Sequence, residues 1–198
     1  AFRRPFANGR QGSLYFEDGF LEEKVRNLAA HGYLVSAHAI GERAIEQLVD
    51  CYEQSEGRHR IDHCEFPAPD TLPRLYRMKP YVTVQPGYAW IDKRYLHGYE
   101  RVLDAQMIAQ QVPLAALAAH GVVLLGSSDS PVQTVDPYLQ MRGMREFYLP
   151  EQSLSAFEAL KAYTVNGGMM LGEKKGLLRR GYEASFFTMD RGLLSLPP

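Results

Sequence analysis

Short, mostly apolar runs alternate with amphipathic segments along most of the chain. Four runs have the length and composition of buried strands, and they cover residues 33–38, 58–63, 81–86 and 121–128. The segments before, between and after them carry apolar residues at helical spacing. We expect helices over about 22–30, 41–52, 70–78, 102–119 with an interruption at Pro113, 137–147, 155–163 and 166–171. Strand and helix thus alternate four times, which is typical of an α/β fold with a parallel sheet.

Four such units with a helix in front resemble the second half of a (β/α)8 barrel. A complete barrel closes at eight units and typically needs about 250 residues. Half a barrel leaves two open sheet edges and an uncovered apolar interior, so we expect a missing N-terminal half, or another chain, to complete the sheet. The string LAAHG supports repeated units, since it occurs at 28–32 and again at 117–121 before an apolar strand. A further short strand is predicted over 184–189.

Composition narrows the class of protein without assigning a function. The chain has 198 residues, of which 45% are hydrophobic and 23% charged, as in ordinary globular proteins. A formal net charge of −1 gives no electrostatic reason to expect nucleic acid or a membrane surface as partner. No apolar run approaches the roughly 18–20 residues of a membrane span. Cys51 and Cys64 form no CxxC pair, so we expect no disulfide framework and a cytoplasmic location.

Three side chains with metal-binding chemistry follow predicted strands. His38 ends the first strand, His63 ends the second, and Asp129 follows the fourth. Two imidazoles and a carboxylate are a ligand set for a divalent ion such as zinc. Because the C-terminal ends of the strands in a parallel barrel converge on one face, we expect these three residues to meet there.

The other histidines carry weaker signals, since a lone histidine is usually structural. His31 and His120 each precede a glycine at the end of a predicted helix, where an imidazole can cap the last carbonyl groups. We interpret both as helix caps. His59 is ambiguous on its short strand, and His97 lies in a predicted loop without an assigned role.

Several motifs occur in a fixed order: HAIGERA at 38–44, RHRIDH at 58–63, VQP at 84–86, GSSDSPV at 126–132 and AYTVNG at 162–167. With these motifs, from about Tyr15 to Met189, the chain resembles the YtcJ-like (amidohydrolase 3) branch of the metal-dependent amidohydrolase superfamily. Glu42 stands where that branch has aspartate, and Asp62 where it has glutamate, so both positions keep their charge. Near the chain end, Ala-Ser replaces the family's Ala-Asp.

The resemblance implies a metal-dependent hydrolase that cleaves an amide-like C–N bond with one or two ions, most simply zinc. It implies His38 and His63 as metal ligands from barrel strands five and six. It also implies Asp129 as the strand-eight carboxylate, which would bind metal and take a proton from the attacking water. The family's first-strand His-x-His pair and fourth-strand ligand have no counterpart here, so we expect them upstream of Ala1. Residues 1–175 then form the C-terminal half of the barrel, and 176–198 begin a small β-sandwich domain.

Substrate contacts and rival functions remain open at this point. Gln85, Tyr88 and Trp90 follow the third strand on the catalytic side, and they either contact a small-molecule substrate or simply cover the barrel mouth. Arg43 either binds a substrate carboxylate or pairs with a neighbouring glutamate. One rival interpretation is a non-catalytic or truncated α/β remnant, and another is a lactonase or phosphotriesterase-type barrel, against which the HAIGERA motif weighs. The sequence also leaves open whether the chain forms a homo-oligomer.

Overall fold

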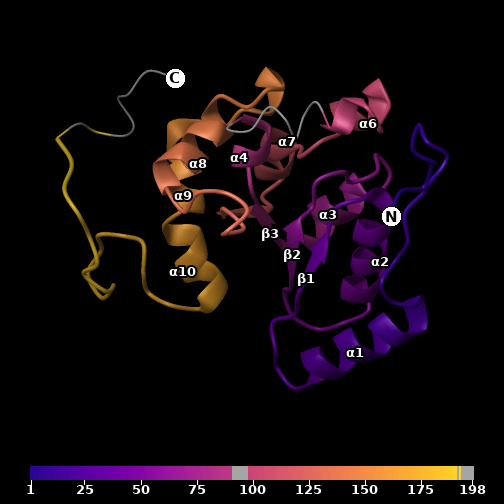
Figure 1. The fold of residues 1–198 in the computed structure, drawn as a ribbon. Coiled ribbons are helices and arrows are strands. Elements are labelled where there is room, and N and C mark those ends of the chain that lie inside the picture. Colours follow the sequence, from indigo (N-terminus) through magenta and orange to yellow (C-terminus); the bar gives the residue numbers. More distant parts are fainter. Residues whose placement is uncertain (91–97, 191, 193–198) are drawn as a thin grey trace.

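A computed structural model describes residues 1–90, 98–190 and 192 (Figure 1). Four short strands pair in parallel and in chain order to form one sheet. They are β1 (Ser36–Ala39), β2 (Arg60–His63), β3 (Tyr81–Val84) and β4 (Val123–Gly126). This order confirms the predicted parallel sheet, although each strand is shorter than the run that predicted it. In the described part of the chain, β1 and β4 are the edge strands.

Helices connect and follow the strands in the predicted alternation. They are α1 (Asp18–Ala30), α2 (Glu42–Glu53), α3 (Leu72–Met78), α4 (Gly87–Trp90), α6 (Ala105–Ala109), α7 (Leu114–Ala119), α8 (Pro137–Arg145), α9 (Ala156–Ala162) and α10 (Val165–Leu171), with a 3-10 turn η1 (Pro150–Gln152). The predicted interruption at Pro113 is confirmed, because this residue precedes α7. The short helix α4 was not among the predicted helices, and residues 91–97, with His97, lie outside the described residues.

The hydrophobic core lies between the sheet and the helices on one of its faces. Ile61, Val82 and Leu124 are neighbours in the strand register and are at most 4% exposed. They belong to one cluster with side chains of α2, α3 and α7, and Figure 1 shows α2 and α3 along one face of the sheet. Because side chains alternate along a strand, the residues that directly follow these three, Asp62, Thr83 and Leu125, face the opposite side of the sheet. That opposite side carries the candidate site.

The repeated LAAHG string has the same structure in both places. His31 follows α1 and donates from Nδ1 to the carbonyl of Asn27 at 2.8 Å. His120 follows α7 and donates from Nδ1 to the carbonyl of Ala116, also at 2.8 Å. The next residue is in each case a glycine with φ near +78°, which is the left-handed conformation that ends a helix. Both histidines are therefore helix caps, as predicted.

The strand predicted over 184–189 is not formed. A strand is stabilised by hydrogen bonds to a neighbouring segment, and Figure 1 shows this part of the tail running away from the sheet. Phe186 and Phe187 within it are 67% and 66% exposed. Cys51 and Cys64 are both buried and carry free thiols. Within the described ranges, no helix combines the length and apolarity that crossing a membrane requires.

Candidate metal centre

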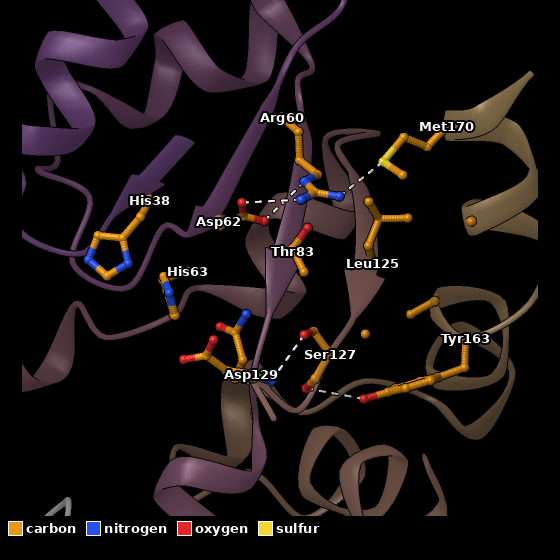
Figure 2. A pocket seen from close by; sticks show the side chains of 14 residues that line it. His38, Arg60, Asp62, His63, Thr83, Leu125, Ser127, Asp129, Tyr163 and Met170 are labelled. Carbon is orange, nitrogen blue, oxygen red and sulfur yellow. Dashed lines mark hydrogen bonds and ion pairs between the residues drawn. The ribbon is translucent and has the colours of Figure 1, made fainter. Parts of the chain in front are cut away.

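One pocket of about 540 Å³ opens on the face of the sheet opposite the helical core (Figure 2). His38, Asp62, Thr83 and Leu125 are partners across the four strands, and all four line this pocket. His63, Gln85, Ser127 and Asp129 line it as well. All three sequence-predicted metal ligands therefore border the same cavity.

The two imidazoles lie next to each other. The ring centroids of His38 and His63 are 4.4 Å apart, and their planes are inclined by 70°. His38 is exposed, whereas His63 is 8% exposed. Burial lowers the pKa of His63, with a further lowering by His38, while Asp129, Asp62 and a hydrogen bond with Gln85 act in the opposite direction. The neutral imidazole, which is the form that binds metal, is thus favoured at His63.

His63 reaches the pocket through an unusual backbone conformation. Ile61 points to the helical core, and simple alternation would send His63 to the same side. However, His63 has a φ of +74°, a left-handed value that redirects its side chain at the strand end. Asp129 is also left-handed, with a φ of +52°. Non-glycine residues held in this region cost about 1–3 kcal/mol each and cluster at functional sites.

The carboxylate of Asp129 is oriented from the neighbouring loop. The hydroxyl of Tyr88 donates to Oδ2 of Asp129 at 2.6 Å. The backbone N–H of Asp129 donates to Oγ of Ser127 at 3.2 Å, and its carbonyl accepts from the N–H of Val132 at 2.9 Å. The turn that carries the carboxylate is therefore fixed at both ends, and Tyr88 holds the side chain itself.

The predicted three-ligand set is not assembled in the structure. In the part of the chain described, no three His, Cys, Asp or Glu side chains are close enough to hold one ion. The two imidazoles are adjacent, and Asp129, whose Oδ2 accepts a hydrogen bond from Tyr88, lines the same pocket without joining them in a three-ligand cluster. The donor chemistry itself fits a zinc-type ion, because two imidazoles and a carboxylate on one cavity are typical zinc ligands. What the geometry supplies is thus a partial coordination sphere.

A charged network at the base of the pocket went unrecognised in the sequence. Nε of Arg60 lies 3.0 Å from Oδ1 of Asp62 and donates to Oγ of Ser36 at 2.7 Å. Ser36 in turn donates to Oδ2 of Asp62 at 2.6 Å. Beside this network, Oγ1 of Thr83 is buried and has no hydrogen-bond partner among the described residues. The period-two pattern of RHRIDH could have placed Arg60 and Asp62 on the pocket face.

The four predicted substrate contacts have different surroundings. Gln85 lines the pocket, and Tyr88 binds Asp129. Trp90 ends α4, but its side chain lies outside what the structure describes. Arg43 is exposed in the first turn of α2, its N–H donates to the carbonyl of Ala1 at 3.2 Å, and it is not among the described residues that line the pocket. The structure therefore does not bring Arg43 to the candidate site.

Comparisons with known proteins agree on one family. The sequence profile of the amidohydrolase family matches residues 1–198. The putative amidohydrolase YtcJ of Bacillus subtilis is 27% identical over 215 aligned positions, covering 98% of this chain and 39% of that protein. A metal-dependent hydrolase of Pyrococcus furiosus, uncharacterized in function, has a similar structure with a TM-score of 0.88 and 26% identity, covering 98% of this chain and 41% of that one. The A. niger ochratoxinase, at 18% identity and a TM-score of 0.66, shares the fold. The chain spans about two fifths of the length of these relatives.

Proposed function

Since the chain belongs to the amidohydrolase family, we propose that it forms part of a metal-dependent hydrolase that cleaves an amide-like C–N bond. The observation that carries this proposal is the adjacent pair of imidazoles, His38 and His63, at the C-terminal ends of neighbouring parallel strands. Asp129 borders the same pocket. The resemblance to a metal-dependent hydrolase of Pyrococcus furiosus supports the dependence on metal.

We assign His38, His63 and Asp129 as ligands of one or two divalent ions, with zinc as the ion that this donor set favours. A bound ion of this kind would bring the pKa of a coordinated water down to about 7 and would polarise a substrate carbonyl. The histidines bind as neutral imidazoles, and the burial of His63 favours that form. The left-handed backbone of His63 keeps its ring on the pocket side.

Asp129 acts as the proton carrier of the reaction. Its carboxylate takes the proton of the attacking water and later delivers it to the leaving nitrogen. Tyr88 fixes Oδ2 of this carboxylate by its hydrogen bond of 2.6 Å, so the group is oriented before the substrate arrives. Gln85, on the same pocket wall, is the substrate contact that the geometry favours among the predicted ones.

Further strands complete the barrel around this site in our proposal. On its outer side, each edge strand of the described sheet, β1 or β4, pairs with no other described strand, and Ser36 and His38 on β1 are exposed. Since the chain spans about two fifths of its relatives, we infer that the remaining strands and ligands come from sequence beyond it or from another chain. Residues 1–175 would then be the C-terminal half of a (β/α)8 barrel, and 176–198 the start of a small β-sandwich domain.

The Asp129→Asn substitution in the complete enzyme tests the function. Turnover of a panel of N-acyl amino acids and dipeptides should fall to background, because the amide cannot take a proton, while zinc content measured by elemental analysis should fall far less. Asp136→Asn is the matched control, since Asp136 caps α8 and asparagine caps equally well. Unchanged turnover in Asp129→Asn would rule out the assigned role. Hydrolysis of lactones or phosphotriesters alone would favour a different class of barrel hydrolase.

A further inference from the structure

We propose that Gln140 in α8 is a positioning residue that sets the orientation of Asp129 by joining the two loops that carry Tyr88 and Asp129. This inference rests on the proposed function, because it concerns the same carboxylate. Gln140 is 1% exposed and does not line the pocket, so it acts through other residues and not by touching substrate.

The carboxamide of Gln140 bonds one loop with each of its ends. Oε1 accepts from the backbone N–H of Gly87 at 3.0 Å. Nε2 donates to the backbone carbonyl of Thr134 at 3.3 Å. A backbone N–H can only donate and a backbone carbonyl can only accept. The side-chain amide of Gln140 therefore has a single orientation that satisfies both the N–H of Gly87 and the carbonyl of Thr134. One buried side chain thus links the segment after β3 to the segment after β4.

Each of these segments carries one partner of the Tyr88–Asp129 hydrogen bond. Gly87 directly precedes Tyr88 in α4, and Thr134 lies between Asp129 and the start of α8. The contacts therefore form a closed ring, from Gln140 through Gly87 and Tyr88 to Asp129, and back through Thr134. A change at any point of this ring alters where the carboxylate of Asp129 lies.

The backbone around this ring is closely packed. A Cβ atom added to Gly143 in α8 would lie 3.1 Å from the backbone carbon and oxygen of Pro86. Figure 1 accordingly shows α8 beside α4. With α8 held against the 86–87 backbone, an apolar side chain at position 140 could fill the space but could not fix the Gly87 N–H or the Thr134 carbonyl. The amide is therefore suited to setting loop positions, and small displacements at a reacting group are costly.

A double-mutant cycle on zinc affinity tests the proposal in the complete, zinc-loaded protein. Zinc affinity is measured by competition with a chelator for Gln140→Met, Tyr88→Phe and the double variant. Loss of a group that orients a ligand typically lowers metal affinity about 10–100-fold, so each single variant should lose about tenfold. Because Gln140 and Tyr88 act on the same carboxylate, their effects should not multiply. The double variant should bind zinc no more weakly than the single variant with the lower zinc affinity. Losses that multiply, or an unchanged affinity in Gln140→Met, would overturn the proposal.

Gln47→Met is the matched control for a buried glutamine. Gln47 is 7% exposed, and its Nε2 donates to the carbonyl of Phe16 and to Oδ1 of Asp18, both at 2.8 Å and away from Asp129. Zinc affinity should be unchanged in this variant even if its thermal midpoint falls. If Gln140→Met does not fold by circular dichroism, Gln140→Glu replaces it, since it keeps the acceptor for Gly87 and loses the donor to Thr134.

Asp129→Ala separates failure of this inference from failure of the proposed function, because alanine, unlike asparagine, offers no oxygen that could still coordinate the ion. If that variant retains full zinc affinity, Asp129 is not a ligand and the proposed metal site is wrong. If it loses zinc while Gln140→Met does not, only the positioning role of Gln140 is wrong.

Discussion

The imidazole rings of His38 and His63 lie edge to face, 4.4 Å apart between centroids, although ordinary strand alternation would place them on opposite faces of the sheet. His38 pairs in register with Asp62, and the next residue along β2 is His63. The left-handed φ of +74° at His63 brings its ring back to the side of His38. The adjacency of the two imidazoles is therefore maintained by a local backbone distortion that costs free energy of folding.

Substitution of either imidazole should abolish tight zinc binding. Loss of an orienting group alone costs about 10–100-fold in metal affinity, so His38→Ala and His63→Ala should each cost at least about 100-fold, measured by chelator competition in the complete protein. His120→Ala is the control, because His120 caps α7. Zinc affinity equal to that of the unmodified protein in either site variant would remove His38 or His63 from the ligand set.

Local patterns in the sequence predicted the fold well. Apolar residues such as Ile61, Val82 and Leu124 bury one face of each strand, and helical spacing between the strands implies parallel crossovers. The two LAAHG strings carry their capping chemistry within a few residues, so His31 and His120 were predictable. These features depend on neighbours close in the chain.

The features that the sequence did not predict depend on contacts between residues far apart in the chain. Tyr88 and Asp129 are joined by a hydrogen bond, yet the sequence suggested only that Tyr88 faces a substrate or covers the barrel mouth. Gln140 looks like an ordinary polar position of an amphipathic helix, and only the structure shows its amide between two loops. The strand predicted over 184–189 requires a pairing segment, which local periodicity does not specify.

Stability should decrease on mild acidification because of His59. This side chain is 3% exposed, Nδ1 accepts from the N–H of Val35 at 3.2 Å, and Nε2 consequently donates to Oγ of Ser55 at 3.0 Å. Burial lowers the pKa of His59 in the folded protein, so the unfolded chain binds the proton more tightly. The stabilisation is thus complete above the unfolded pKa of about 6.5 and is lost as the pH falls below it, by at most about 1.4 kcal/mol per pH unit.

The comparison with His59→Gln isolates this contribution to the pH dependence. Glutamine can accept from Val35 and donate to Ser55 but does not titrate. Urea unfolding between pH 7.5 and 5 should therefore show a smaller loss of unfolding free energy for the variant than for the unmodified protein. Parallel pH curves for the two proteins would contradict the assignment.

The two helix caps should differ in strength. His31→Ala and His120→Ala each remove one hydrogen bond to a helix carbonyl, which is worth about 0.5–1.5 kcal/mol. The ring of His120 also stacks on Tyr76, with centroids 3.8 Å apart and planes inclined by 7°. We therefore expect His120→Ala to lower the free energy of unfolding, measured in urea, by about 0.5–1.5 kcal/mol more than His31→Ala does. In a Tyr76→Leu background the two costs should become equal, and a persistent difference would exclude stacking as its cause.

Two adjacent glycines of α10 should respond in opposite directions to the same substitution. A Cβ atom at Gly167 meets no atom within 4 Å, whereas at Gly168 it would lie 2.8 Å from the carbonyl oxygen of Lys175 and 3.1 Å from that of Glu173. Gly167→Ala should raise the free energy of unfolding by up to about 1 kcal/mol, because alanine favours the helix. Gly168→Ala should lower it by about 1–3 kcal/mol, because the turn after α10 must move away. That turn is also held by the N–H of Glu173, which donates to the carbonyl of Gly168 at 2.8 Å, so it cannot yield freely. The two variants add the same methyl group to the same helix, so each is the control for the other. If urea unfolding shows effects of the same sign, packing against residues 173–175 does not explain why glycine occupies position 168.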